Sequence, residues 1–530
     1  MKNKKIGFTL IELLAVIIVL AIIALIATPI IFNVIENAKI KSLENSCYGV
    51  IDAIRTKYAE GLLNLNKITN GNVNELTVSG EKPIDGTWTI DNSKDSEQRG
   101  IKIDNVRFSS MKDYACSNDL ETGKVSCKKT YKDNSSANTP ILFKNMVPIK
   151  YENNKWIIAD LGQKWYDYDA KEWANAVVLN SGVTKNVGDE VTEEEISLWY
   201  VWIPRYKYTI FNGNNGSAAA QLINVTFESG TARTGTVSCV DNFDEDNRSE
   251  ICTDNTNGSI INGTSTYTHP AFKFGNTELT GFWVGKFEIS TTDSTCNSWV
   301  SKANCDKVLT MSIKPNVSSW RYATISNYFT SIQNAKTTYG ISNADSHMLK
   351  NMEWGAVAYL KQSKYGLGTA DIAVNDNSSY YTGGGTSDAY KTNVAQSTTG
   401  NIYGVYDMSG GAWEYVMGNM KNSSNAFYSS SAGFTTAPDA KYYDSYKYGT
   451  SYTSHARGKL GDAMKETLTT FGNTSGGWYS DYAHFPLSSA PWFVRGGGYG
   501  LGTNAGVFFF VDHYGGGSSG NSARAVLSAQ

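Results

Sequence analysis

The stretch Lys4-Lys-Ile-Gly-Phe-Thr-Leu-Ile-Glu-Leu-Leu14 joins a basic start to an apolar segment that continues almost unbroken to Phe32. About 20 apolar residues are enough to cross a bilayer as a helix, so the run from Phe8 to Phe32 predicts a transmembrane segment. The lysines before Gly7 would keep the N-terminus on the cytoplasmic side. Glu12 lies within the apolar run, and because a carboxylate is costly in lipid, its presence predicts a specific partner.

This pattern resembles the class III signal of type IV pilins and pseudopilins, and the resemblance covers residues 1–60. It implies that a prepilin peptidase removes the leader 1–7 by cutting between Gly7 and Phe8, and that the new amino group of Phe8 is N-methylated. It also implies that Glu12 pairs with this amine in a neighbouring pilin subunit, which agrees with the need of a buried carboxylate for a cation. An ordinary signal peptide would instead place a small-residue cleavage site after the apolar run.

The region behind the apolar run predicts a longer helix and a small head. Apolar residues recur three and four positions apart there, so we expect one assembly helix over 8–65 whose amphipathic end packs on a globular head. The segments Gly86–Ile90 and Gly100–Phe108 have the composition of strands, which predicts a small β head over 66–135. The polar segment 132–139 is typical of a linker.

Six of the seven cysteines fall into three close pairs, which are Cys116 with Cys127, Cys239 with Cys252, and Cys296 with Cys305. Local disulfides are expected in an exported chain, although six cysteines allow many connectivities and proximity alone favours these pairs. Cys47 is left over on the expected helix, where we predict a buried free thiol. The sequence has no CxxC pair and no histidine-rich cluster, so it indicates no metal site of that kind.

Composition adds weaker constraints. Charged residues make up 18% of the chain and the formal net charge is −3, so the basic footprint of a nucleic-acid-binding protein is missing and no such partner is expected. Helices are expected over Ser326–Tyr339 and Met348–Lys364. The acidic loop Asp241–Asn257 suggests either a structural calcium site or a solvated loop. It lacks the spacing and the glycine of an EF-hand, which favours the solvated loop and no cofactor.

Five segments of the larger C-terminal region resemble the formylglycine-generating-enzyme or sulfatase-modifying-factor family, whose fold is a variant of the C-type lectin fold. They are Gly281–Ser290, Asn351–Tyr359, Asn401–Val416, Val494–Tyr499 and Ser522–Val526. The third is close to the family's core motif, whereas the last is degraded. The resemblance implies one domain over 140–530 with its core at 195–530. The expected fold class is therefore α+β, with a long N-terminal pilin helix, a small β head, and a large Gly- and Trp-rich C-type-lectin-like domain with few helices.

The charged residues of these motifs predict scaffold roles. Buried carboxylate–guanidinium pairs are expected among Glu353, Asp407, Glu414, Arg495 and Arg524. The enzymes of the family hold copper with a cysteine pair near the C-terminus, and this chain has no cysteine after Cys305. The nucleophile motif GxSxG and the phosphate-binding motif GxxxxGK[ST] are also missing. We therefore predict no enzyme activity, with a site assembled from scattered residues as the alternative.

Binding is the favoured function of the C-terminal region. Domains of this family are also displayed by proteins that retroelements diversify, and the variable stretch there follows an RGG strand, where this chain has Tyr499–Ser522. Aromatic anchors among small polar residues characterise antibody paratopes as well. The predicted ligand-binding residues are Tyr499, Phe508, Phe510, Asp512, His513 and Tyr514. The alternative is a terminal strand with its aromatics in the core, where alternation would bury Val507, Phe509 and Val511, or else Phe508 and Phe510.

Together these patterns predict a surface-displayed pilin-like subunit, with a minor or tip pilin favoured. We expect a single pass through the cytoplasmic membrane before assembly, followed by an extracellular position in a pilus or on the cell surface. The expected ligand is an extracellular protein or glycan. The alternatives are a pseudopilin of a secretion or DNA-uptake system, an exported enzyme, and a passive spacer.

Replacing Glu12 by Val should leave export and cleavage intact but impair assembly, because the Phe8 ammonium would lose its partner in a low-dielectric core. Replacing Gly7 by a bulky residue should instead block processing. Immunoblots of membrane and sheared filament fractions measure both effects. Normal incorporation of the Glu12→Val chain into filaments would contradict the pairing.

Overall fold

The computed structural model describes two compact units, Met1–Thr130 (unit 1) and Tyr131–Gln530 (unit 2). The described residues are 10–63, 70–90, 100–120, 122–213, 216–233, 235, 237–241, 250–254, 262–293, 296, 305–341, 343–471 and 476–529. For residues 10–33, 240, 241, 250, 251 and 254 the description is confined to the backbone. Each unit is treated by itself.

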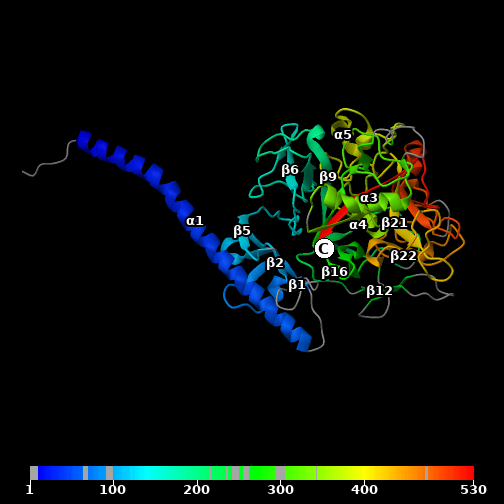
Figure 1. The fold of residues 1–530 in the computed structure, drawn as a ribbon, viewed down its shortest axis with the longest axis horizontal. Helices are drawn as coiled ribbons and strands as arrows, with labels where there is room; N and C mark the ends of the chain where they lie inside the picture. Colours follow the sequence, from blue (N-terminus) through cyan, green and yellow to red (C-terminus); the bar gives the residue numbers. More distant parts are fainter. Residues whose placement is uncertain are drawn as a thin grey trace, which may run out of the picture. The chain divides into compact units, whose positions relative to one another are not determined.

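Unit 1 contains one long helix, α1 (Leu10–Leu63; Figure 1). Between Leu43 and Tyr58 its buried side chains recur at helical spacing and form one apolar stripe, which comprises Leu43, Cys47, Val50, Ile51, Ile54 and Tyr58. No helix within the described residues has the length and apolarity that crossing a membrane requires. The apolar run Phe8–Phe32 lies outside the residues whose side chains are described, so its membrane assignment stays a prediction.

The α1 stripe packs against a five-stranded antiparallel sheet in the order β1-β2-β3-β4-β5. The strands are β1 (Asn70–Asn72), β2 (Pro83–Ile90), β3 (Ile101–Phe108), β4 (Tyr114–Asn118) and β5 (Val125–Lys129), with 3-10 turns η1 (Val73–Glu75) and η2 (Ser109–Met111). Gly86 interrupts the β2–β3 register with φ +120°, and a Cβ there would lie 2.7 Å from the Cα of Val106. Only glycine fits this close strand approach.

Unit 2 is built on a seven-stranded antiparallel sheet in the order β20-β26-β17-β9-β8-β6-β7. Its strands are β6 (Met146–Glu152), β7 (Lys155–Ile158), β8 (Asn175–Leu179), β9 (Ile196–Pro204), β17 (Gly281–Gly285), β20 (Ala344–Met348) and β26 (Ala525–Ala529). The helices are α3 (Ile325–Thr338), α4 (Asn351–Lys361) and the short α5 (Ala389–Thr392). The last strand of the chain, β26, therefore pairs inside this sheet, between β20 and β17.

A second sheet of unit 2 is centred on β21 (Trp413–Met420) and β23 (Trp492–Gly496). β21 runs parallel to β22 (Asp444–Tyr446) and β25 (Asn521–Ala523), and β23 runs antiparallel to β24 (Gly506–His513). Smaller pairings join β10 (Tyr206–Thr209) to β11 (Val225–Phe227) and β14 (Thr266–Thr268), β12 (Val237–Asp241) to β13 (Glu250–Asp254), β15 (Lys273–Phe274) to β16 (Thr277–Glu278), and β18 (Ser290–Thr291) to β19 (Met311–Ser312). The 3-10 helices of the unit are η3 (Glu193–Glu195), η4 (Pro270–Phe272), η6 (Thr382–Gly384), η7 (Val394–Gln396), η8 (Ala440–Tyr442), η9 (His455–Arg457), η10 (Trp478–Ser480) and η11 (Tyr499–Asn504).

The core of unit 2 is dominated by indole rings. Those that are almost completely buried belong to Trp156, Trp173, Trp199, Trp202, Trp283, Trp320, Trp354, Trp478 and Trp492. Large aromatic side chains remove much apolar area from water, and this compensates for the scarcity of helices.

The structure joins the three cysteine pairs that the sequence favoured. Cys116 is bonded to Cys127 and Cys239 to Cys252, each across two directly opposed strand residues, and Cys296 is bonded to Cys305. A bond between opposed residues adds a covalent link to a strand pair that is already hydrogen bonded. Cys47 is a buried free cysteine on α1.

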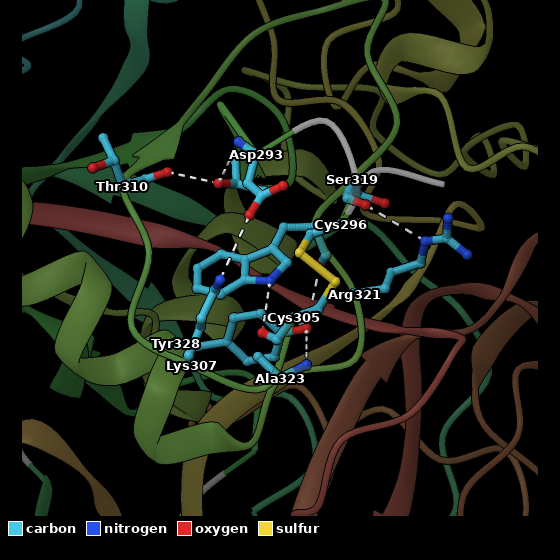
Figure 2. The surroundings of a disulfide bond; sticks show 11 residues. Asp293, Cys296, Cys305, Lys307, Thr310, Ser319, Arg321, Ala323 and Tyr328 are labelled. Atoms are coloured by element: carbon cyan, nitrogen blue, oxygen red, sulfur yellow. Dashed lines mark hydrogen bonds and ion pairs between the residues drawn. A yellow bond between two sulfur atoms is a disulfide. The ribbon is translucent and has the colours of Figure 1, made fainter. Parts of the chain in front are cut away.

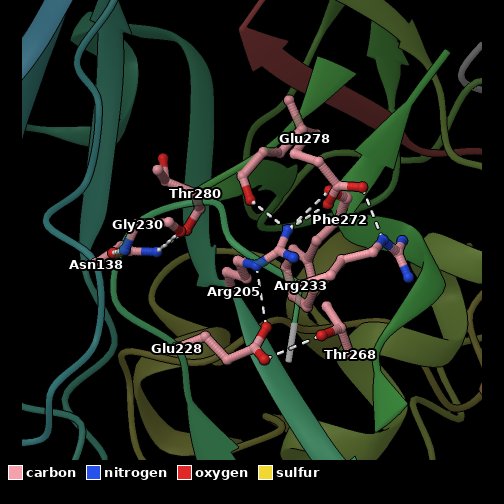
Figure 3. A network of polar contacts seen from close by, with 10 residues as sticks. Asn138, Arg205, Glu228, Gly230, Arg233, Thr268, Phe272, Glu278 and Thr280 are labelled. Carbon is pink, nitrogen blue, oxygen red and sulfur yellow. Dashed lines mark hydrogen bonds and ion pairs between the residues drawn. The ribbon is translucent and has the colours of Figure 1, made fainter. Parts of the chain in front are cut away.

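The segment 132–139 is not a linker, and the head does not extend to residue 135. Unit 1 ends at Thr130, and the polar segment that follows is integrated into unit 2. The Asn138 side-chain amide donates to the backbone oxygens of Thr280 (2.9 Å) and Gly230 (3.1 Å), and its carbonyl accepts from the Gly230 amide (2.8 Å; Figure 3). Buried polar atoms need such partners, so side-chain polarity did not mean solvent exposure here.

Beside Asn138, a buried arginine is held by two acids (Figure 3). The Arg205 guanidinium is 3.0 Å from Glu228 and 2.7 Å from Glu278, and its side chain is fully buried. Glu278 also contacts Arg233 at 2.7 Å, where the arginine side chain is 37% exposed. Thr268 donates to the second oxygen of Glu228. The two arginines thus share one acid but differ in exposure.

Replacing Arg205 by Leu should lower the stability of unit 2 by about 3–5 kcal/mol, because it removes the guanidinium from the Glu228 carboxylate, which stays buried. The matched control Arg233→Leu changes an exposed pair on the same acid and should cost less than about 1 kcal/mol. Thermal and urea unfolding of the two variants measure the difference. Equal destabilisation by both substitutions would contradict the assigned role of burial.

Candidate binding surface

The two sheets of unit 2 are connected at Arg524, which lies between β25 and β26. Its guanidinium donates to both carboxylate oxygens of Glu414 on β21, at 2.5 and 2.9 Å. It also donates to the backbone oxygens of Gly285 at the end of β17 (2.7 Å) and Tyr406 (2.9 Å). Arg524 and Glu414 are both fully buried. One side chain therefore joins the seven-stranded sheet to the sheet that carries β21.

The other charged motif residues have different partners from those expected. Arg495 donates to the Asn351 side chain (2.8 Å) and to the backbone oxygens of Asp462 and Ala463. Asp407 accepts from the Asn375 side chain and the Gly383 amide. The expectation of carboxylate–guanidinium pairs holds for Arg524 with Glu414. Arg495 and Asp407 instead hydrogen bond to buried amides and carbonyls.

His347 is the histidine most closely surrounded by acids. Its ring nitrogens lie 3.3 Å from Asp345 and 3.0 Å from Glu353. Burial opposes protonation, but the two carboxylates raise the pKa of His347 above its ordinary value. All three side chains are at most 5% exposed, so a substrate has no direct access to them. Glu353 also accepts from the Lys350 amide at the start of α4, which indicates a structural role.

The loop 514–520, between β24 and β25, is fixed to the body of unit 2 by its own backbone. The carbonyl of Gly516 accepts from the Tyr415 hydroxyl at 2.6 Å. The carbonyl of Ser518 accepts from the Tyr322 amide at 3.0 Å, and that of Ser519 accepts from the Arg321 guanidinium at 3.0 Å. We call this loop, which begins with Tyr514, together with Tyr322, Tyr380 and Tyr499 the C-terminal face.

Two tyrosines of the C-terminal face have unusual backbones. Tyr322 and Tyr380 adopt φ +70° and +58°, in the left-handed region that bulky residues rarely occupy. The Tyr380 ring meets the Tyr499 ring edge to face at 4.9 Å, and the buried Arg321 guanidinium lies 4.1 Å from the Tyr380 ring centre. Burial also raises the pKa of Tyr380. Strained residues of this kind cluster at functional sites, where the surrounding structure must hold them.

The disulfide between Cys296 and Cys305 lies next to the segment that carries Arg321 and Tyr322. Figure 2 shows it beside Tyr328 and near Arg321. The backbone oxygen of Cys305 accepts from the Trp320 indole at 3.4 Å, and the Tyr328 hydroxyl lies 2.8 Å from the Asn521 carbonyl oxygen on β25 and 3.2 Å from that of Trp320. The segment that carries Arg321 and Tyr322 is thereby tied both to the disulfide and to the strand after the loop.

Two predicted contact residues are wrong. The side chains of Phe508 and Phe510 are fully buried, so neither is available to a ligand. Phe508 packs on Trp478, and Phe510 packs on His455. Strict alternation also fails, because Val507, Phe508, Phe509 and Phe510 are all at most 1% exposed. The physical reason is that both faces of β24 are covered by other parts of unit 2, although β24 is the last strand in the order of its sheet.

The remaining predicted residues fall into two groups at opposite ends of the β23–β24 pair. Tyr499 lies near the Gly496–Gly506 end, whereas His513 is paired with Trp492 at the other. His513 stacks on Tyr514 at 4.3 Å, and Tyr514 is 44% exposed. Burial lowers the pKa of His513 to about 4, so its ring is uncharged at neutral pH. The loop 514–520 runs between the two groups.

Asp512 lies beside this second group. Its carboxylate is 4.0 Å from His484, and burial raises its pKa to about 6. Tyr452 approaches the same histidine with a ring separation of 5.1 Å. The residues that sequence reasoning missed are Arg321, Tyr322 and Tyr380, because they are distant in the chain and no motif marks their left-handed backbones.

Two sequence predictions fall on parts that the structure does not describe. Gly7 and Phe8 precede the described residues, and the side chain of Glu12 is not described. Most of the acidic loop Asp241–Asn257 also lies outside the described ranges, so calcium binding there stays untested.

Comparison with known proteins identifies the N-terminus. Residues 2–28 match the family model of the prokaryotic N-terminal methylation motif, so the chain has a type IV pilin-like N-terminus. No curated protein matches the chain. A solved structure described as Major Tropism Determinant U1 Variant is 12% identical, with coverage of 86% of this chain and 83% of that one, but at a TM-score of 0.24 the likeness carries no argument. The resemblance of unit 2 to formylglycine-generating enzymes therefore stays a prediction.

Replacing Gly517 by Ala should loosen the loop, because a Cβ there would clash with the backbone oxygen of Tyr322. The matched control is Gly500→Ala on the same face, where nothing lies within 4 Å of the added atom. Hydrogen exchange of the loop amides should become faster in Gly517→Ala and stay unchanged in Gly500→Ala. Unaltered exchange in the Gly517 variant would show that the loop is not held as described.

Proposed function

We propose that this chain is a pilin-like subunit whose C-terminal face binds an extracellular protein or glycan. The N-terminal methylation motif indicates processing by prepilin peptidase and assembly with other pilin subunits. It implies a membrane-anchored precursor that becomes surface-exposed in the pilus. The proposal adds that unit 2 is the displayed part and that binding, rather than catalysis, is its task.

The observation that carries the binding role is the pair of half-buried tyrosines with left-handed backbones, Tyr322 and Tyr380, beside the anchored loop 514–520. Tyrosine supplies a large amphipathic contact at low entropic cost. A loop that is already fixed loses less freedom when a ligand binds, which favours affinity. Tyr499 and Tyr514 extend the same aromatic face toward its two ends.

Catalysis is the weaker candidate. The copper-binding cysteine pair of the resembled enzymes is missing from the sequence, and the acid–histidine group around His347 is closed to solvent. A pseudopilin of a secretion or DNA-uptake system remains the nearest alternative because it shares the N-terminal motif. We favour a minor or tip pilin, since unit 2 is bulky beside a pilin helix and would crowd a densely packed filament.

Diversification of the loop 514–520 by a retroelement is a separate proposal. Homologous loci that carry a template repeat would support it.

The binding role can be tested on cells that display the full chain. Replacing Tyr380, Tyr499 and Tyr514 together by Ala should reduce adhesion to host cells, or binding of detergent-extracted chain to a glycan array, at least tenfold. The control Val187→Ser removes a side chain that is 63% exposed on a different loop and should bind normally.

Surface amount and thermal stability must match the unaltered chain in both variants. Undiminished adhesion by a folded, displayed triple variant would refute the assigned face. Loss of adhesion in Val187→Ser as well would show that the effect is not specific to it.

A further inference from the structure

Three sulfur atoms meet inside unit 1. Cys47 lies on α1 with a fully buried side chain, and Cys116 and Cys127 are opposed residues of β4 and β5 that share a disulfide. The three sulfurs all lie within 4.8 Å of one another. A free thiol thus stands next to both atoms of an existing disulfide.

The packing of α1 fixes this meeting. Cys47 belongs to the same buried stripe as Leu43 and Val50, which faces the sheet. Turning the helix to remove the thiol would expose these apolar neighbours to water, at a cost of about 1.5–3 kcal/mol for each large side chain. The apolar packing of α1 against the sheet therefore holds the Cys47 thiol beside the disulfide.

We propose that the three sulfurs form an exchange site through which the disulfide can move onto α1. The Cys47 thiolate attacks one sulfur of the Cys116–Cys127 bond and forms a new S–S bond with it. The other sulfur leaves as a thiolate and takes up a proton in place of the one that Cys47 lost. One S–S bond forms and one breaks, so the step needs no external oxidant or reductant.

The exchange would change which elements of unit 1 the disulfide joins. The present bond joins two neighbouring strands that are already paired by backbone hydrogen bonds. The relocated bond would join α1 to β4 or β5, which are otherwise held together mainly by apolar packing. Exchange would therefore convert the contact between helix and head from a packed one into a covalent one.

The surroundings keep the exchange slow in the folded state. Burial, together with the smaller effect of the nearby Glu44 carboxylate, raises the pKa of Cys47 to about 12, so the reactive thiolate is scarce at neutral pH. The other titratable groups on this side of α1 and the sheet include Tyr58 of the buried stripe, Tyr48, whose hydroxyl accepts from the Val125 amide, and Tyr114, whose hydroxyl donates to Glu36. None of these supplies a positive charge that would favour the thiolate.

Single-cysteine replacements in the full exported chain test the geometry. In Cys127→Ser we expect a disulfide between Cys47 and Cys116, and in Cys116→Ser one between Cys47 and Cys127. Acid-quenched, non-reducing peptide mapping by mass spectrometry identifies them. The control with both Cys47 and Cys127 replaced by Ser should keep one alkylatable thiol. Two alkylatable thiols in both single variants, after oxidation and with unit 1 folded, would overturn the proposal.

The unaltered chain supplies the second test. Incubated without added thiol, it should yield peptides linked through Cys47, and their rate of appearance should rise about tenfold per pH unit between pH 7 and 10, because the thiolate fraction does. The Cys47→Ser chain should show only the Cys116–Cys127 link throughout. Failure to find any Cys47-linked peptide at pH 10 would overturn the exchange even if the single variants form their new bonds.

Discussion

The arrangement of unit 2 depends on the contact between Arg524 and Glu414. A buried ion pair is costly to desolvate, and it is tolerated only when its remaining hydrogen bonds are made. Here the Arg524 guanidinium donates to both oxygens of the Glu414 carboxylate and to two backbone carbonyls. One of these carbonyls belongs to Gly285, the last residue of β17 in the seven-stranded sheet. The pair therefore specifies how the two sheets meet. It also fixes the point where β25 ends, and so holds the strand into which the preceding loop leads.

That placement explains why the C-terminal face is pre-formed. The loop 514–520 leaves β24, an edge strand of its sheet that is buried on both faces, and leads into β25, which ends beside Arg524. Its backbone carbonyls accept hydrogen bonds from Tyr415, Tyr322 and Arg321. The Cys296–Cys305 disulfide and Tyr328 hold the segment that carries Arg321 and Tyr322. The backbone strain at two tyrosines is sustained by this surrounding structure. A surface that is already fixed supports the proposed binding role, because it loses little freedom when a ligand binds.

Local patterns predicted the elements better than their partners. Neighbouring residues were enough to predict helices near α3 and α4, strands near β2 and β3, and the close cysteine pairs. The burial of individual side chains could not be predicted in this way, because it depends on contacts between residues that are distant in sequence. Phe508 and Phe510 look like contact residues until the second covering layer of β24 is known, and the polar segment 132–139 looks like a linker until Asn138 meets Thr280. Tyr322 and Tyr380 carry no local signal, since backbone strain is a property of the folded environment.

The central claim is that a pilin-type N-terminus presents the C-terminal face outside the cell. Immunogold electron microscopy of intact cells, with antibodies raised against the loop 514–520, tests it most directly. The account predicts gold on surface filaments, at their tips or along their length, and no gold in a strain that lacks the chain. Label that appears only after the cells are permeabilised, or that stays on cell bodies and never on a filament, would contradict it.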